Sequence, residues 1–247
     1  MPVSQGLNMD PRIPLYYQLM QLFRQQIEEG EYQPGDSFPS ENELCERFGV
    51  SRPTVRQALN ELVREGLLHR VKGKGTFVSA PKIQQDFMQK LVSFTEEMQQ
   101  KGLKGTTRVL SLQLVPALKN VAAYLTLAIE EPVFQLDRLR FINDEPIVVV
   151  TTYLPQKYCP TLNQQDLNNQ SLYKTLEDQY SIRISRARRI LEVIAATEEY
   201  AKLLEIDVGA PIQLSRTIAW DQYNRPIEFS IARYRGDRSQ FTIDLIR

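Results

Sequence analysis

The stretch FGVSRPTVRQAL, residues 48–59, decides how the first third of the chain folds. Gly49 ends one segment of helical periodicity, and Ser51 can accept a hydrogen bond at the N-terminus of the next. Apolar residues recur at helical spacing through that second segment, at Val55, Ala58, Leu59, Leu62 and Val63. Arg52 and Arg56 lie four residues apart on another face. The stretch predicts two helices joined by a tight turn, the second with an outward basic face.

Two helices are predicted upstream of this turn. Pro14 is a favourable first-turn residue, and an apolar face follows at Leu15, Leu19, Leu22, Phe23 and Ile27. This helix ends near Gly30. After a turn at 33–36, Ser40 precedes Glu43 by three residues, the spacing of a capping box that opens a short helix ending at Gly49.

A basic hairpin is predicted downstream. Strand-like runs at 67–71 and 76–78 flank the tip KGKG at 72–75. Three helices followed by a basic hairpin are the layout of a winged helix-turn-helix, which we place at residues 10–79. Residues 1–9 show no periodicity and are expected to be disordered.

Charge is distributed unevenly along the chain. Its 247 residues are 42% hydrophobic and 24% charged, with a formal net charge of zero. Seven basic residues against two acidic ones lie between Arg47 and Lys74. A basic stripe in a neutral chain is typical of a nucleic-acid contact surface.

Several classes of protein are disfavoured by the sequence. No apolar run is long enough for a membrane helix, and residues 1–10 lack the pattern of a signal peptide, so we expect a cytoplasmic protein without membrane contact. Cys45 and Cys159 have no redox or metal-ligand spacing. No cofactor and no metal site are expected.

The rest of the chain has a different character. A linker is expected at 80–92, where core anchors are few, followed by an effector-binding domain at 93–247. Strand patterns occur at 106–115, 132–142, 146–154, 183–195, 211–220, 226–235 and 240–245, and short helical patterns at 94–101, 119–125, 171–180 and 197–204. We therefore expect an α+β fold on a mostly antiparallel sheet.

The third helix carries the chemistry that reads DNA. Arg bonds two acceptors on guanine, while hydroxyl and backbone donors hold phosphates. Ser51, Arg52, Thr54 and Arg56 supply these donors near the start of the helix. The alternative is an ordinary solvated helix face.

A longer pattern resembles the GntR family of bacterial regulators. It comprises PLY at 14–16, PGD at 34–36, FPSENEL at 38–44, the stretch at 48–59, GL at 66–67 and GKGTFV at 73–78. The resemblance implies that Ser51, Arg52, Thr54 and Arg56 approach the operator. It also implies that Gly73 and Gly75 let the backbone of the hairpin approach the DNA minor groove, and that Lys72 and Lys74 contact phosphates. Asn42 stands where many relatives carry a DNA-contacting Arg.

The resemblance and the physics of operators both imply a dimer. One short module buries little surface, whereas two modules on a palindromic duplex roughly add their binding free energies. We expect a homodimer on double-stranded operator DNA, and the family's usual behaviour is repression.

The second domain resembles the effector (UTRA-type) domain of HutC-type GntR regulators, which shares its fold with chorismate lyase. The signatures are SFTEEM at 93–98, GL at 102–103, PV at 132–133, RLR at 138–140, PI at 146–147, YLP at 153–155, SLY at 171–173, PIEFS at 226–230 and YRGDR at 234–238.

An anion site is predicted in this domain from the residues alone. Ser93, Phe94 and Thr95 begin a helical pattern, so hydroxyls and free backbone N–H groups converge there. Arg138 and Arg140 alternate along a strand, which directs both guanidinium groups to one face, and Arg suits bidentate phosphate or carboxylate recognition. We therefore expect a small anionic metabolite as effector.

Further pocket residues are indicated from two sources. Ser171 and Tyr173 begin another helix and can add donors. The resemblance to sensors of phosphorylated amino sugars implies that Glu228 and Tyr234 contact the sugar, so a sugar phosphate is expected. Val150 stands where those sensors place a carboxylate, so the ligand need not be the amino sugar. A non-phosphorylated carboxylate is the alternative effector.

Other interpretations remain open at this point. Arg138 and Arg140 could form a surface ion-pair ladder, Ser93 could simply cap a helix, and Glu228 could be a solvated strand residue. An enzyme is disfavoured because the single histidine, His69, falls in the hairpin. A third alternative is an architectural DNA-binding protein with a purely dimerising second domain. If an effector is sensed, its ordering of the segment around Ser93 would change the spacing of the DNA modules and release DNA.

Overall fold

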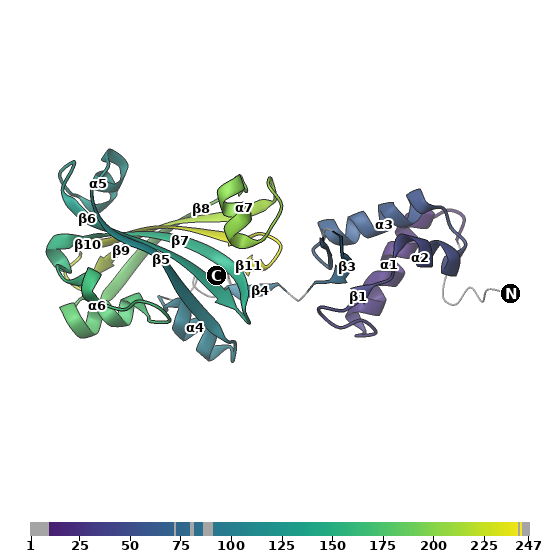
Figure 1. Cartoon of the computed structure of the whole chain (residues 1–247), viewed down its shortest axis with the longest axis horizontal. Coiled ribbons are helices and arrows are strands. Elements are labelled where there is room, and N and C mark those ends of the chain that lie inside the picture. The colour runs from purple at the N-terminus through teal and green to yellow at the C-terminus, as the bar shows by residue number, and fades with distance from the viewer. Residues whose placement is uncertain (1–9, 72, 80–81, 86–90, 242, 244–247) are drawn as a thin grey trace, which may run out of the picture. The chain divides into compact units, whose positions relative to one another are not determined.

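The computed structural model describes residues 10–71, 73–79, 82–85, 91–241 and 243 (Figure 1). The chain divides into two compact units, one up to Lys82 and one from Ile83 onward. The segment expected to be disordered, 1–9, lies outside the described residues, as do Lys72 and residues 80–81 and 86–90 of the expected linker.

The first unit combines helices with a small antiparallel sheet. Its elements are α1 (Leu15–Glu28), β1 (Ser37–Phe38), α2 (Glu41–Phe48), α3 (Arg52–Arg64), β2 (Leu68–Val71) and β3 (Gly75–Val78). The core between the helices holds Leu19, Phe23, Leu44, Val55, Leu59 and Leu62, all at most 1% exposed. The predicted apolar faces of the three helices therefore meet in one core.

Capping residues fix where the second and third helices begin. Ser40 accepts a hydrogen bond from the backbone N–H of Glu43, and the Glu43 side chain accepts one from the Ser40 N–H, which confirms the predicted capping box. Ser51 caps α3 by accepting from the N–H of Thr54. Gly49 adopts a left-handed conformation (φ 64°), which makes the tight turn between the helices possible.

The sheet of the first unit has one strand more than the predicted hairpin. β2 and β3 pair antiparallel as expected, and β1 pairs with the other edge of β3, giving the order β1-β3-β2. β1 was missed because two residues are too few to show an alternating pattern. It ties the segment before α2 to the wing.

The second unit is built on a long sheet. Its elements are β4 (Ile83–Gln85), α4 (Phe94–Gln100), β5 (Gly105–Pro116), α5 (Lys119–Leu125), β6 (Pro132–Ile142), β7 (Glu145–Pro155), α6 (Leu172–Tyr180), β8 (Ile184–Ala195), α7 (Glu198–Leu204), β9 (Pro211–Asp221), β10 (Pro226–Arg235) and β11 (Ser239–Phe241), with 3₁₀ turns at Gln156–Tyr158 and Leu162–Gln164. The sheet order is β5-β6-β7-β10-β9-β8, and every neighbouring pair is antiparallel. The α+β prediction is confirmed.

Helices cover both faces of this sheet, as Figure 1 shows. Residues of α6 pack with Phe134 and Leu136 of β6, and Met98 of α4 packs with Ile142 near the end of the same strand. Residues of α5 pack on the opposite face with Val133, and those of α7 with Leu139. Because side chains alternate along a strand, α4 and α6 share the face of Arg138 and Arg140.

The expected linker contains a strand. β4, at Ile83–Gln85, pairs in parallel with β11, with Ser239 opposite Ile83 and Phe241 opposite Gln85. The polar composition of the segment hid this strand, which is held by backbone hydrogen bonds to a distant partner. The expected last strand, 240–245, is described as β11 at 239–241.

Candidate functional site

The first candidate surface is the outer face of α3. Ser51 Oγ and Thr54 Oγ1 lie 2.8 Å apart at the helix N-terminus. Arg52 follows directly and is exposed, and Asn42 is exposed in the first turn of α2. Four of the residues expected to contact DNA thus lie on the two helices of the helix-turn-helix and near their N-terminal ends.

Arg56 is partly held by its own unit. Its Nη2 lies 3.0 Å from Oε2 of Glu41 in α2, although 59% of the Arg56 side chain remains exposed. Arg70 of β2 approaches the same carboxylate at 3.7 Å. The hydrogen bond from Arg56 lowers the pKa of Glu41 below its ordinary value. Arg56 can meet a phosphate or a base only by sharing or leaving this ion pair.

The wing presents a basic tip between β2 and β3. Gly73 and Gly75 adopt positive φ angles of 76° and 121°, which other residues rarely accept. Lys74 is exposed between them. Lys72, also expected to contact phosphate, lies outside the described residues.

The second candidate site is a cavity in the second unit. It contains about 720 Å³ of empty space, counting its open mouth. All nine residues predicted to bind an effector line it: Ser93, Phe94, Thr95, Arg138, Arg140, Ser171, Tyr173, Glu228 and Tyr234. They come from α4, β6, α6 and β10 and from the residues that cap the two helices. The structure brings the set together; binding itself stays a prediction.

Two helix N-termini border the cavity. Ser93 caps α4 by accepting from the N–H of Glu96 and donating its own N–H to the Glu96 carboxylate. Ser171 caps α6 by accepting from the N–H of Lys174 at 3.2 Å. Ser93 and Ser171 therefore do serve as helix caps, and this role leaves them on the cavity wall.

Two arginines dominate the charge of the cavity. Arg138 is only 2% exposed, so the alternative of a surface ion-pair ladder is wrong. Burial, with the neighbouring Arg140 guanidinium, lowers the pKa of Arg138 to about 9, and burial also lowers the pKa of Arg140. Arg140 lies over the Phe94 ring, 5.0 Å from its centroid. The Nε atom of each arginine has no hydrogen-bond partner among the described residues.

An acidic and two phenolic side chains face these arginines. Glu228 is 5% exposed, so the alternative of a solvated strand residue is wrong. Burial raises the pKa of Tyr173 well above its ordinary value, and the Glu228 carboxylate adds to the shift. Burial raises the pKa of Tyr234 to about 12. Both phenols are therefore neutral hydrogen-bonding groups at physiological pH.

The structure adds lining residues that the sequence analysis missed. Arg189 of β8, Ser215 and Thr217 of β9, and Ser230 of β10 also line the cavity. Only strand pairing shows that these strands share its floor. One signal was present: Ser215 and Thr217 alternate along β9 between the apolar residues Leu214 and Ile218, and serine and threonine are uncommon at inward positions.

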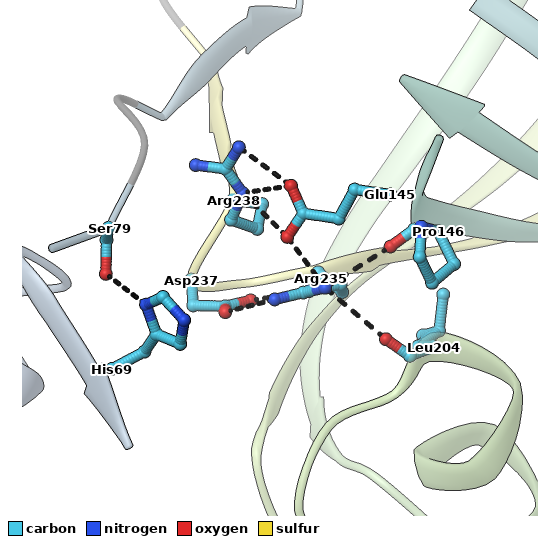
Figure 2. Close-up of polar contacts among 8 residues, drawn as sticks. All are labelled: His69, Ser79, Glu145, Pro146, Leu204, Arg235, Asp237 and Arg238. Atoms are coloured by element: carbon cyan, nitrogen blue, oxygen red, sulfur yellow. Dashed lines mark hydrogen bonds and ion pairs between the residues drawn. The ribbon is translucent and has the colours of Figure 1, made fainter. Parts of the chain in front are cut away.

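The end of β10 carries an ionic network on the face of the sheet opposite the cavity (Figure 2). Arg235 follows the cavity residue Tyr234 and points to the opposite face of the sheet. Its Nη1 lies 2.9 Å from Glu145 and its Nη2 lies 2.8 Å from Asp237. Arg238 binds the same Glu145 carboxylate at 2.9 Å.

The network also reaches backbone groups. Arg235 donates to the carbonyl oxygens of Pro146 and Leu204 at 3.5 Å (Figure 2). It thereby joins the start of β7, the end of α7 and the turn into β11. Because β11 pairs with β4, the network connects the cavity strand β10 with the first strand of this unit.

Three further observations bear on enzyme and membrane alternatives. His69 lies in β2 of the first unit, with Nδ1 3.3 Å from the Ser79 hydroxyl (Figure 2). Among the described residues, no three His, Cys, Asp or Glu side chains gather as metal ligands would. In that same part of the chain, no helix has the length and apolar character to span a membrane.

Comparison with known proteins supports the two-unit organisation. Residues 15–78 match the family of bacterial regulatory proteins called the gntR family, and residues 100–240 match the UTRA domain. The transcriptional repressor NagR of Bacillus subtilis is 41% identical over 236 residues, covering 96% of each chain. The mannosyl-D-glycerate transport/metabolism repressor MngR of Escherichia coli is 33% identical over 232 residues, covering 93% of this chain and 95% of that protein.

A solved structure extends the similarity to the fold. The crystal structure of PhnF from Mycobacterium smegmatis superposes with a TM-score of 0.65 at 30% sequence identity, covering 92% of this chain and 99% of that one.

The fold and the comparisons define a DNA-binding transcription regulator. This assignment replaces the alternative of an enzyme. The chain belongs to the GntR family and carries its UTRA domain.

Proposed function

We propose that this protein is a cytoplasmic repressor of the HutC type, which binds a palindromic operator as a homodimer and is released by a phosphorylated sugar. The operator contacts come from Asn42, Ser51, Arg52, Thr54, Arg56, Lys72, Gly73, Lys74 and Gly75. The effector contacts come from Ser93, Phe94, Thr95, Arg138, Arg140, Ser171, Tyr173, Glu228 and Tyr234.

One observation carries the effector proposal: Arg138 and Arg140 line one cavity, and neither guanidinium forms an ion pair with a carboxylate among the described residues. Arg138 is 2% exposed, and burial, with the neighbouring Arg140 guanidinium, lowers its pKa. A phosphate dianion between them restores the charge balance and accepts hydrogen bonds from both. The serine hydroxyls at the N-termini of α4 and α6 stand on the same wall.

The relatives agree with a sugar-related ligand. One relative is the repressor of the mannosyl-D-glycerate transport/metabolism system, and another, 30% identical over 230 residues, is the probable repressor of the fructoselysine utilisation operon of Escherichia coli. Val150 is 5% exposed and lines the cavity. No charge is available at that position to pair with an ammonium group, which favours sugars without a free amine.

The second unit also suggests how effector binding would alter DNA binding. Ser93 lies eight residues beyond the end of β4, and β4 pairs with β11 beside the Arg235 network. Ligand ordering of the Ser93 segment would bias the position of β4 and hence of the chain leading to the DNA-binding unit. A small change in module spacing breaks the fit to two half-sites.

The test uses full-length protein and a duplex selected from a random pool by the wild type. Fluorescence anisotropy measures the affinity for this duplex with and without hexose 6-phosphates, their unphosphorylated sugars and small carboxylates. We expect at least one sugar phosphate to weaken DNA binding, and the duplex to weaken binding of that ligand by the same factor. Release by a carboxylate alone would replace the phosphate proposal, and no release by any of them would contradict it.

A further inference from the structure

Little structure holds β4 on the second unit. In the described part of the chain, β4 (Ile83–Gln85) pairs only with β11, and the two short strands form a sheet of their own beside the six-stranded one. An isolated pair of strands is marginally stable at best, and parallel pairs are slightly weaker per residue than antiparallel ones. Other groups must therefore fix β11 in place if β4, called the strap below, is to stay docked.

The turn between β10 and β11 supplies such groups. Gly236 donates its N–H to the carbonyl oxygen of Pro211, the first residue of β9, at 3.0 Å. A Cβ atom at position 236 would lie 2.7 Å from that oxygen, so the close approach of the two backbones requires glycine. The turn is thereby held against the long sheet just before β11 begins.

Glu145 joins the same turn to β7. Its carboxylate lies 2.9 Å from Nη2 of Arg238, the residue directly before β11, and 2.9 Å from Nη1 of Arg235 (Figure 2). Both arginines are buried. Hydrogen bonds between charged groups are about twice as strong as neutral ones, and a low local dielectric strengthens them further. This one carboxylate therefore contributes much of the attachment of β11.

Docking of the strap limits the covalent reach between the two units. Ser79 is fixed to the first unit, because its N–H donates to the Leu67 carbonyl at 2.9 Å. With the strap docked, the chain is next fixed at Ile83, and a span of four residues reaches at most about 14 Å. With the strap detached, the chain is next fixed at Val92 on the cavity wall, and thirteen residues reach up to about 45 Å.

Tether length matters to a protein that binds two half-sites at once. The duplex fixes the separation of the half-sites, so a short tether accepts few separations and a long tether accepts many. The effective concentration of the second DNA-binding unit also falls roughly as the −3/2 power of tether length. Lengthening the tether from four to thirteen residues therefore lowers this concentration about sixfold.

We propose that Glu145 is a positioning residue for operator spacing: by fixing Arg238 and β11 it keeps the strap docked, and so it restricts the half-site separations that the protein accepts. This inference rests on the proposed function in one respect, because it takes the operator to be bound by two copies of the chain. It adds a determinant of DNA specificity that lies outside both candidate sites.

Hydrogen–deuterium exchange of the full-length protein, measured by mass spectrometry, tests the docking. We expect the backbone amides of 83–85 to be protected in the wild type, and Glu145→Gln to speed their exchange about tenfold or more, the effect of weakening one or two charged hydrogen bonds. Asp144→Asn is the matched control. It removes the same charge from the adjacent residue, whose partner is the exposed Lys104 at 3.0 Å, and asparagine accepts the positive φ of 68° at that position.

Fluorescence anisotropy tests the consequence for DNA, with the selected duplex and with duplexes that carry two or four extra base pairs at its centre. Two base pairs turn one half-site by about 70° and move it by about 7 Å. We expect the wild type and Asp144→Asn to bind the altered duplexes about tenfold or more weakly than the selected one. Glu145→Gln is expected to bind the selected duplex about sixfold more weakly than the wild type does, and to lose less than about threefold more on the altered ones.

A second variant acts on the strap and leaves the ionic network unchanged. Successive N–H groups of a strand point to opposite sides, so one of two neighbouring residues in β4 donates toward β11. Ile83→Pro/Gln84→Pro removes this donor whichever residue carries it, and is expected to reproduce the loss of spacing selectivity. Lys82→Pro places a proline just before the strap and is the control, with wild-type selectivity expected.

The outcomes separate the inference from the proposed function. Equal binding of all spacings by the wild type would contradict binding to two half-sites, and with it both proposals. Selectivity that is present in the wild type and retained by Glu145→Gln and by the double proline variant would overturn the inference alone, as would unprotected amides at 83–85 in the wild type. Loss of selectivity in the double proline variant but not in Glu145→Gln would overturn the role of Glu145.

Discussion

The arginines of the two units differ in their exposure to solvent. In the DNA-binding unit, Arg52 and Arg56, which we propose contact DNA, stand on an exposed helix face where water and salt screen their charges. In the effector unit, Arg138 and Arg140 stand in an enclosed cavity that lowers their pKa values. Exposed arginines suit a long polyanion that is recognised by many weak contacts, whereas buried arginines suit one small anion held by a few strong ones.

The largest effect is expected from Arg138→Met. Loss of a buried cation that pairs with the ligand costs about 100-fold or more in sugar phosphate affinity. Without ligand, the same change removes a desolvated charge, so the melting temperature of the unliganded protein is expected to stay equal or rise. Calorimetry and thermal unfolding measure the two. Arg188→Met, at an exposed position of β8, is the control for both. A large fall in melting temperature would show that Arg138 serves the fold instead.

The next largest effect is expected from Arg52→Ala in the DNA-binding unit. Loss of a bidentate base contact costs about 1 to 3 kcal/mol, roughly 5- to 150-fold in affinity for the selected duplex. Non-specific binding is expected to change far less. Arg64→Ala, at the other end of α3 and paired with Glu61, is the control. Fluorescence anisotropy on the selected and scrambled duplexes measures the two affinities. An equal loss of affinity for both duplexes would mean that Arg52 contacts only phosphates.

A pH titration is expected to act on the effector unit. Burial lowers the pKa of Arg138 in the unliganded protein to about 9, well below the ordinary value of an arginine. Binding of sugar phosphate, which needs the cation, is expected to weaken by up to tenfold per pH unit above that point. Tyr234, with a pKa of about 12, does not titrate in this range. Calorimetry from pH 7.5 to 10 measures the slope, and Arg138→Met should reduce it; the remaining slope belongs to Arg140, whose pKa burial also lowers.

The contribution of Arg138 to folding stability has the opposite sign. Above about pH 9, and below the ordinary pKa of arginine, the unfolded chain keeps a proton that the folded chain has lost, so this group adds stability as pH rises through that window. Chemical denaturation of wild type and Arg138→Met at pH 8 and 10 isolates the difference. A wild type that loses more stability than the variant on going to pH 10 would contradict the lowered pKa.

The smallest effect is expected from Glu41→Gln. This change frees Arg56 and Arg70 from a carboxylate at 3.0 and 3.7 Å and removes a negative charge beside the residues proposed to contact DNA. Because exposed ion pairs contribute about 0 to 1 kcal/mol, affinity for any duplex is expected to rise by no more than about fivefold. The gain should shrink with added salt, which anisotropy between 50 and 200 mM salt would reveal. Weaker DNA binding would mean that Glu41 positions Arg56 for contact.

Periodicity and capping made most of the fold predictable. Helices α1 to α3 and the strands of the long sheet follow apolar patterns, and Ser40 and Ser51 mark helix starts by their chemistry. β1 and β4 were missed for a common reason: two or three residues carry no period, and their existence depends on partners far along the chain.

The cavity was predictable only in part. The nine expected residues belong to local motifs, namely two helix starts and the alternating positions of β6 and β10. Ser215, Thr217 and Arg189 enter the cavity through the pairing of β8 with β9 and of β9 with β10, which no local pattern encodes. Their roles, like those of the nine, stay predictions until ligand is measured.

The pairing of β4 with β11 also has a consequence for biosynthesis. The DNA-binding unit has its last strand at Val78, whereas the partner that fastens β4 ends at Phe241. At about 5 to 20 residues per second, the ribosome needs roughly 10 to 30 seconds to cross that interval. During this time each new polypeptide has a complete DNA-binding unit and an incomplete second unit. The protein can therefore fold its DNA-binding unit before the second unit can bind any effector.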